Sequence, residues 1–237
     1  MMITLLGTGH VFRIAEPVSF IVKNIWPDAV LVELDTTRYG VLMSPEGIGD
    51  IENQPKEYRK MAKYQRKVAE ENESRVGAEF IAAIETGRTI GAAIEFIDKD
   101  AAQVMRETME EMPFFEKFRF RFGSIRDVFS RKKNADNAVK EFGDNEEGYM
   151  NSIRKRFPTL VRKLIDERDV HMVAKIKEAS GKYGNIVVVI GDGHVEGIAK
   201  LLEGETIRKI RLKTLMDPER MNALRSELWT GMPEEKE

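Results

Sequence analysis

The sequence predicts an α/β fold in which strands near both ends of the chain form one sheet, covered by helices, with a largely helical insertion in the middle. Two observations support this. Short apolar runs at 3–6, 29–33, 92–97 and 186–190 resemble strands of a parallel sheet, which are buried on both faces and apolar throughout. The longer segments between them carry apolar residues at helical spacing.

Turn residues set the ends of the expected elements. The first strand is closed by Gly7 and Gly9, the helix over 15–25 ends before Pro27, and Glu33 stands where the second strand ends. The later elements are expected as helices over 55–73, 78–91, 101–112, 149–157, 158–181 and 194–203, with strands over 92–97, 185–190 and 206–212.

Length and composition indicate one globular domain over 1–237, with a helical insertion or cap at about 101–157 and a polar tail at 233–237. The 38 basic and 40 acidic residues leave a net charge of −2, which gives no general attraction to nucleic acid. The chain has no cysteine, which excludes disulfides and thiolate chemistry and is compatible with a reducing cytoplasm, the expected location. No apolar run reaches the roughly 18–20 residues of a transmembrane helix, so none is expected.

Two octamers of the chain are alike: GTGHVFRI at 7–14 and GDGHVEGI at 191–198. Each follows a predicted strand and places a histidine, His10 or His194, directly after a Gly-x-Gly turn. Glycine lets the backbone turn sharply and approach a ligand closely, so Gly7, Gly9, Gly191 and Gly193 are candidate binding positions. No longer repeat accompanies the octamers, and duplication of two halves stays an open alternative.

The carboxyl ends of parallel strands share one edge of a sheet, where open α/β sheets bind ligands. We therefore expect His10, His194 and Glu33 to converge, with Arg38 nearby. Two imidazoles and a carboxylate suit a divalent metal such as Mn, Co or Zn, which would activate water. Arg38 would then hold a substrate carboxylate or an oxyanion.

These turns also have other interpretations. A single histidine in a turn is usually a structural hydrogen-bonding group, but two in matching octamers favour a functional role. Gly7 also begins a pattern like a dinucleotide-binding loop, although the third glycine of that motif is missing.

The chain also resembles the TraB/PrgY family and its wider Tiki and GumN-like relatives. The matching segments are LLGTGHV at 5–11, WPDAVLVELDTTRY at 26–39, GAEFIAAIETG at 77–87, IDKD at 97–100, FPTLVRKLIDERDVHMVAKI at 157–176 and VVVIGDGHVEGI at 187–198. The resemblance implies functional roles for His10, Glu33, Arg38 and His194, and extends them to Glu79 and Arg168. Tiki relatives are described as metal-dependent proteases, whereas TraB/PrgY members are known for shutting down a peptide pheromone.

Three of these residues have ordinary alternatives. Glu79 lies one residue from the apolar face of its predicted helix, so a solvated side chain is an alternative to a ligand. Arg168 lies in a charge cluster that is typical of a helix surface, and only the resemblance gives it a role. Asp192 either bonds to its own turn or supports a ligand histidine.

The stretch 114–133 interleaves phenylalanines with basic residues. Such a pattern fits single-stranded nucleic acid or a membrane surface, but packing on the core or on a partner subunit is favoured because the net charge gives no support. We expect this stretch to contribute to a homodimer contact or to cap the cleft.

Two functions follow from these residues. The first is a metal-dependent hydrolase acting on a peptide or small amide, with Glu33, Arg38 and Arg168 as catalytic residues and His10, His194 and Glu33 as metal ligands. The alternative is a non-catalytic protein that sequesters a peptide in the same cleft. The two histidines paired with Glu33 favour the enzyme, and the lack of a dedicated general base, such as the glutamate of a His-Glu-x-x-His helix, favours the binder.

Overall fold

The computed structural model describes residues 1–44, 56–122 and 146–230. Five strands form one sheet in the order β3-β2-β4-β1-β5, and every neighbouring pair is parallel. The strands are β1 (Met2–Thr8), β2 (Ala29–Val32), β3 (Ala93–Phe96), β4 (Asn185–Gly191) and β5 (Ile207–Ile210). The prediction of a single sheet built from strands near both ends of the chain is confirmed.

The two seven-residue strands lie side by side in the middle of the sheet. β1 pairs with β4 along its whole length, from Met2 opposite Asn185 to Thr8 opposite Gly191. Both runs are apolar and buried, as expected for central parallel strands. This pairing joins residues far apart in the sequence and brings the two Gly-x-Gly turns to the same edge of the sheet.

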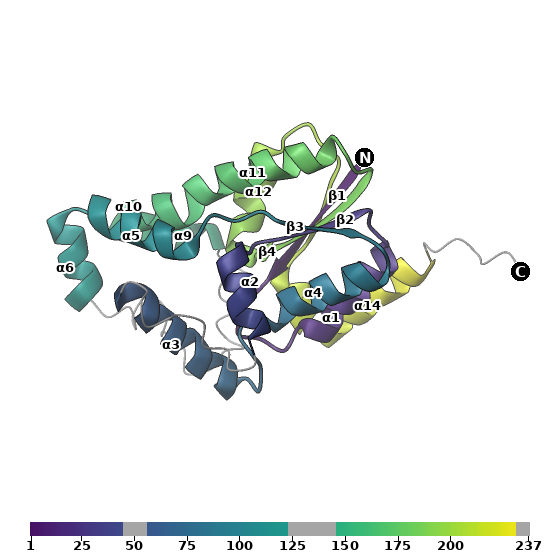
Figure 1. Ribbon diagram of the computed structural model, residues 1–237, viewed down its shortest axis with the longest axis horizontal. Helices are drawn as coiled ribbons and strands as arrows, with labels where there is room; N and C mark the ends of the chain where they lie inside the picture. The colour runs from purple at the N-terminus through teal and green to yellow at the C-terminus, as the bar shows by residue number, and fades with distance from the viewer. Residues whose placement is uncertain (45–55, 123–145, 231–237) are drawn as a thin grey trace, which may run out of the picture.

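Helices cover both faces of the sheet (Figure 1). One layer contains α1 (Ala15–Ile25), α4 (Ala78–Thr89) and α14 (Pro218–Thr230), and the opposite layer contains α11 (Glu167–Ser180) and α12 (Val195–Leu201). Successive side chains of β1 alternate between them: Leu6 packs into the first layer and Leu5 into the second. Each core is therefore built by alternate residues of the same strands.

The chain leaves β1 and β4 toward opposite faces. After β1 it enters α1 in one layer, and after β4 it enters α12 in the other. In an open parallel sheet such a divergence leaves a crevice between the carboxyl ends of the two strands, where ligands bind. The fold thus places a binding position between the two octamers.

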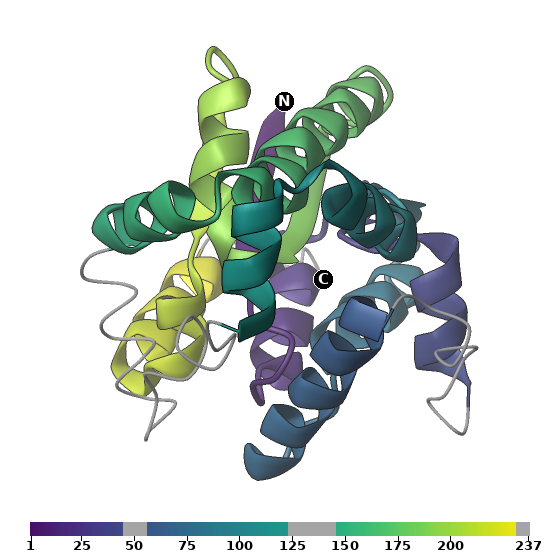
Figure 2. The same ribbon diagram turned by 90° about the vertical axis from the view of Figure 1, so that its left-hand side faces the viewer.

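Further helices project beyond this edge of the sheet (Figures 1 and 2). They are α3 (Lys56–Glu71), α5 (Ala101–Glu111), α6 (Phe114–Phe122), α9 (Glu146–Arg156) and α10 (Pro158–Val161). A small core of Met112, Phe120, Phe157 and Leu160 packs α5, α6 and α10 together. A π-helical turn, Arg162–Asp166, joins α10 to α11.

Two features differ from the sequence-based expectations, and a third expectation is only partly covered by the described residues. The helix α2 (Thr36–Met43) was not predicted, because two threonines and Gly40 are weak helix formers; Asp35 caps its first turn, accepting from the Arg38 N–H at 2.8 Å. The continuous helix expected over 158–181 is interrupted by the π-helical turn. Within the expected stretch 114–133, residues 114–122 form α6, while 123–133 and the tail 233–237 lie outside the described residues.

Substitution of Gly87 by alanine should lower the free energy of unfolding by about 1–3 kcal/mol, because overpacking strains a dense core. A Cβ atom at Gly87 would lie 2.8 Å from Ile94 Cδ1 and 2.9 Å from Val30 Cγ2, where α4 packs on the sheet. Gly40→Ala is the matched control, since Gly40 has no atom within 4 Å of that position and alanine favours the helix by about 0.5–1 kcal/mol. Urea denaturation measures both, and equal effects would contradict this account of the packing.

Candidate functional site

The site begins with the two histidines that follow β1 and β4. Their octamers are similar in sequence but continue differently: His194 closes a 3-10 turn (Asp192–His194) that leads directly into α12, whereas several non-helical residues separate His10 from α1. The likeness of the octamers therefore lies in where they place an imidazole and not in a shared backbone path.

Each histidine is held by a buried carboxylate from a flanking helix. His10 Nδ1 lies 2.7 Å from Glu79 Oε1 of α4, and His194 Nδ1 lies 2.6 Å from Asp169 Oδ1 of α11. The Glu79 side chain is 0% exposed and that of Asp169 5%. Because α4 and α11 belong to opposite layers, one pair comes from each face of the sheet. With Nδ1–H donating to the carboxylate, each ring keeps Nε2 for other partners.

Glu33 lies between the two imidazoles. Its Oε2 accepts from the Gly191 N–H at 2.6 Å, and its Oε1 accepts from Arg168 Nη2 and lies 3.5 Å from His194 Nε2. A Cβ atom at Gly191 would lie 3.3 Å from Glu33 Oε2, 3.6 Å from His194 Cδ2 and 3.7 Å from His10 Nε2. Both rings and the carboxylate thus gather on the side of Gly191 where a side chain would point.

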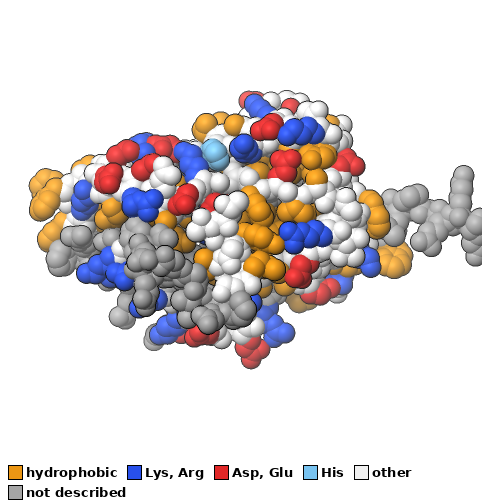
Figure 3. Space-filling view, viewed as in Figure 1, with side chains coloured by type: hydrophobic (Ala, Val, Ile, Leu, Met, Phe, Trp, Pro, Cys, Tyr) orange, Lys and Arg blue, Asp and Glu red, His pale blue; other side chains and the backbone are white. Residues whose placement is uncertain are grey.

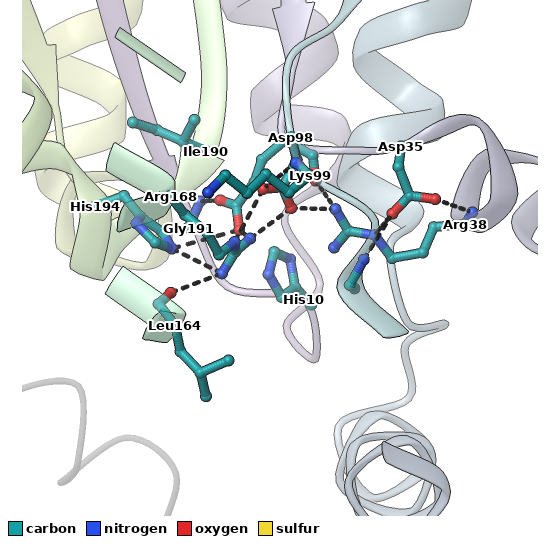
Figure 4. A network of polar contacts seen from close by, with 12 residues as sticks. His10, Asp35, Arg38, Asp98, Lys99, Leu164, Arg168, Ile190, Gly191 and His194 are labelled. Atoms are coloured by element: carbon teal, nitrogen blue, oxygen red, sulfur yellow. Dashed lines mark hydrogen bonds and ion pairs between the residues drawn. The ribbon is translucent and has the colours of Figure 1, made fainter. Parts of the chain in front are cut away.

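Two arginines are locked together by Asp98, whose side chain is fully buried (Figure 4). Asp98 Oδ1 accepts from Arg168 Nε at 2.9 Å, and Oδ2 accepts from Arg168 Nη2 at 2.6 Å and from Arg38 Nη2. Arg38 also donates to Asp35 Oδ2 at 2.6 Å and to the Glu33 carbonyl at 3.0 Å. The guanidinium groups are therefore positioned before any substrate binds.

Arg168 also joins this network to His194. Its Nη1 donates to the Leu164 carbonyl in the π-helical turn at 2.9 Å and lies 3.3 Å from His194 Nε2 (Figure 4). Single π-helical turns are frequent at functional sites, where they redirect side chains. In this chain the turn precedes two consecutive residues, Arg168 and Asp169, that both reach the site.

These contacts shift ionisation in defined directions. Burial alone would raise the pKa of Glu33, but the charges of His194 and Arg168 outweigh it and hold this pKa far below the usual range. Burial lowers the pKa of His10, yet the hydrogen bond and charge of Glu79 raise it overall. Burial raises the pKa of Asp169, an effect that its bond to His194 only partly offsets.

The structure brings together six of the residues singled out in the sequence: His10, Glu33, Arg38, Glu79, Arg168 and His194. Glu79, for which a solvated position was the alternative, is buried. The roles inferred for these residues stay predictions.

Asp192 is not part of this cluster. Its Oδ1 accepts from the Leu212 N–H at 2.8 Å and from Arg211 Nε at 2.9 Å, so it supports neither a histidine nor its own turn. The reason lies in β5, which places Arg211 beside the second octamer.

Gly7 serves the same packing, because a Cβ atom there would overlap Asp192 Oδ1. Gly9 lies against Phe12, and Gly193 has no neighbour within 4 Å of a Cβ position.

Sequence reasoning missed Asp98 and Asp169. Asp98 follows the third strand by two residues, a position similar to that of Glu33 after the second, and this could have drawn attention to it. Asp169 adjoins Arg168 in a cluster of charges that resembles an exposed helix face, so the sequence carries no signal for its role.

A family model described as the TraB/PrgY/gumN family matches residues 2–214. The chain belongs to this family. An uncharacterised protein of Methanocaldococcus jannaschii is 29% identical over 211 residues, which cover 85% of this chain and 53% of that protein. The chain therefore spans about half the length of this TraB/PrgY/gumN relative. Among its described residues, no helix is both long and apolar enough to cross a membrane.

The donor set of the site bears on the metal that the resemblance implies. Each Nε2 is left over after Nδ1 binds a carboxylate, an arrangement common for metal-ligating histidines. However, both oxygens of Glu33 are engaged, and Arg168 places a cation 3.3 Å from His194 Nε2. No three His, Asp or Glu side chains of the described residues are arranged to hold an ion. In this arrangement the residues do not fit a metal, and the divalent metal stays a prediction.

Replacing Glu33 by glutamine should destabilise the protein in a pH-dependent manner. A carboxylate whose pKa is lowered by folding stabilises the protein above its unfolded value, near 4.5, and this contribution is lost as the pH falls below it. The melting temperature of Glu33→Gln should therefore lie below that of the wild type at pH 7, and the gap should narrow toward pH 3. A gap that does not change with pH would contradict this assignment.

Alanine at Gly197 should separate Asp169 from His194, because its Cβ atom would overlap Asp169 Oδ2. The 15N NMR signals of the His194 ring report this directly, since loss of the carboxylate releases Nδ1–H. Gly193→Ala is the matched control in the same octamer, as nothing lies within 4 Å of its Cβ position. Unchanged ring signals in Gly197→Ala would refute the pairing.

Proposed function

We propose that this protein is a hydrolase that cleaves a peptide or another small amide at the carboxyl edge of the sheet. One observation carries the proposal: two imidazoles, each held at Nδ1 by a buried carboxylate from opposite helical layers, face the same point beside Gly191 and Glu33. A histidine with a structural role does not need a second oriented imidazole facing it, whereas acid–base catalysis needs two oriented groups, one to accept a proton and one to donate it.

His194 serves as the general base in this proposal. The Asp169 carboxylate fixes the tautomer with a proton on Nδ1, which leaves a lone pair on Nε2. The attacking water takes the place of the Arg168 N–H that lies 3.3 Å from Nε2. Water adds to the carbonyl carbon of the substrate while its proton passes to His194 Nε2. This is the division of roles found when an aspartate orients a catalytic histidine.

His10 serves as the general acid. It is the more exposed of the two imidazoles, with 26% of its side chain accessible against 6% for His194, and the Glu79 carboxylate favours its protonated form. As the tetrahedral intermediate collapses, the carbon–nitrogen bond breaks and His10 gives a proton to the leaving nitrogen. Solvent then returns the proton lost by His10 and takes up the proton held by His194, which restores both groups.

The arginines support the negative charge that develops on the carbonyl oxygen. Arg38 and Arg168 are 22% and 13% exposed, and Asp98 fixes both guanidinium groups in advance. Donors that are positioned before reaction stabilise an oxyanion without the cost of reorganising.

A sequestering protein is the second candidate, and one observation favours it. Glu33 is saturated by Arg168 and Gly191, and so provides no free carboxylate to activate water. In that function the same edge of the sheet would hold a peptide, with the arginines binding its carboxylate.

Hydrolysis of a mixed peptide library, followed by mass spectrometry, tests the proposal. His194→Ala and Asp169→Asn should each lower the rate about 10²–10⁴-fold, the usual contribution of a general base and its orientation. His171→Ala is the matched control, because this third histidine lies half-buried on the same helix as Asp169.

The metal expected from the sequence is decided in the same experiment. Untagged protein is analysed for bound elements and assayed after chelation and with added Mn, Co or Zn. Activity that needs added metal would support the metal-dependent mechanism over acid–base catalysis by the two histidines alone. Peptide binding with no cleavage under any condition would leave the sequestering function.

A further inference from the structure

The helix α6 exposes aromatic side chains although it is firmly anchored. Phe114 and Phe115 are 74% and 77% exposed, and their rings stack edge to face at 5.7 Å. On the opposite side, Glu116 Oε1 accepts from the N–H groups of Thr159 and Leu160 at 3.0 and 3.1 Å, capping α10. The exposure is therefore a fixed property of the surface and not a consequence of a loosely attached helix.

The aromatic surface is accompanied by positive charge. Exposed Arg119 and half-buried Lys117, whose Nζ donates to the Glu110 carbonyl at 3.3 Å, flank it, while the only acidic residue of α6, Glu116, is buried beneath α10. At the end of α5, Glu110 and Glu111 are exposed, and Glu111 is paired with Arg162 and Lys163. The neighbouring projecting helix α3 also exposes lysines, at Lys56, Lys60, Lys63 and Lys67. The space-filling view shows the hydrophobic group at the end of the molecule where α6 lies, with both basic and acidic side chains near it (Figure 3).

We propose that α6 docks this protein on the surface of a membrane that contains anionic lipids. Phenylalanines that stand beside lysine and arginine on a helix match the interface of a bilayer, where rings enter the acyl boundary and cations meet phosphate groups. A second copy of the chain fits less well, because a two-fold contact through α6 would pair this surface with itself and so bring two basic surfaces together. Single-stranded nucleic acid could bind the basic charges. However, the rings of Phe114 and Phe115 pack edge to face and so do not present two open faces on which bases could stack.

The position of α6 determines which side of the protein a bound membrane would face. It lies at the end of the molecule toward which the strands run (Figure 1), so a bound membrane would face the carboxyl edge of the sheet. The docking surface itself does not depend on the proposed hydrolase activity, since none of its residues belongs to the candidate site.

Vesicle flotation tests the proposal with the complete chain. Binding is expected to vesicles of phosphatidylcholine mixed with anionic phosphatidylglycerol, and to weaken in high salt, because the attraction is partly electrostatic. Vesicles of phosphatidylcholine alone should bind far less. Equal binding to both vesicles, or to neither, would overturn the proposal.

Two sets of variants separate the aromatic and electrostatic contributions. Phe114→Ser with Phe115→Ser should abolish flotation, and Lys117→Gln with Arg119→Gln should weaken binding about fivefold per charge removed. Trp229→Ser is the matched control: this side chain is 69% exposed but lies on α14, so binding should not change. An equal loss in all three variants would mean that adsorption is nonspecific and would refute docking through α6.

A Phe115→Trp variant reports insertion directly. Its added fluorescence should shift to shorter wavelength on anionic vesicles and be quenched by bromine-labelled acyl chains. Sedimentation of the same proteins tests whether a second copy of the chain or a nucleic acid binds α6 instead. A wild-type dimer that dissociates when Phe114→Ser is combined with Phe115→Ser would overturn the proposal. So would a complex with single-stranded oligonucleotide but none with vesicles.

Discussion

The parallel pairing of β1 with β4 is the constraint on which the rest of the structure depends. Thr8 opposite Gly191 sets the two Gly-x-Gly turns side by side, and the chain then leaves in opposite directions across the sheet. A slip of one residue would turn every side chain of one strand to the other face, and both cores forbid this because they are filled by alternate residues. The register is therefore fixed by packing, and it in turn fixes the relative positions of the two histidines in the candidate site.

The cost of burying charge shapes the site that this register creates. Five carboxylates (Glu33, Asp35, Glu79, Asp98 and Asp169) face two guanidinium groups and two imidazoles. Buried charges are tolerated only when they are paired and hydrogen-bonded, so each of these acids contacts an arginine or a histidine. Burial opposes a charge on His10, but the buried carboxylate of Glu79 favours its protonated form, which agrees with the raised pKa of His10. The same network that holds the side chains in place also provides groups able to move protons.

The projecting helices differ from the core of the sheet in that they leave large apolar side chains exposed. α6 buries Glu116 and Phe120 against α10 and its neighbours and leaves the aromatic pair of its first turn exposed. One connection of these helices to the core runs through the π-helical turn, whose Leu164 carbonyl binds Arg168. Another runs from Asp98, which binds both arginines, into α5. The projecting helices and the site thus meet at these segments, although each is built from its own residues.

The sequence by itself determined the fold class, the positions of the strands and the convergence of His10, Glu33 and His194. It did so because apolar runs and glycine turns are local signals, and because parallel strands must share their carboxyl edge. It did not reveal that Asp169 holds His194, that Asp98 joins two arginines or that Asp192 belongs to Arg211. Those contacts were decided by the tertiary structure: an acidic residue on a helix looks the same in sequence whether it faces water or a buried partner, and only packing between layers distinguishes the two.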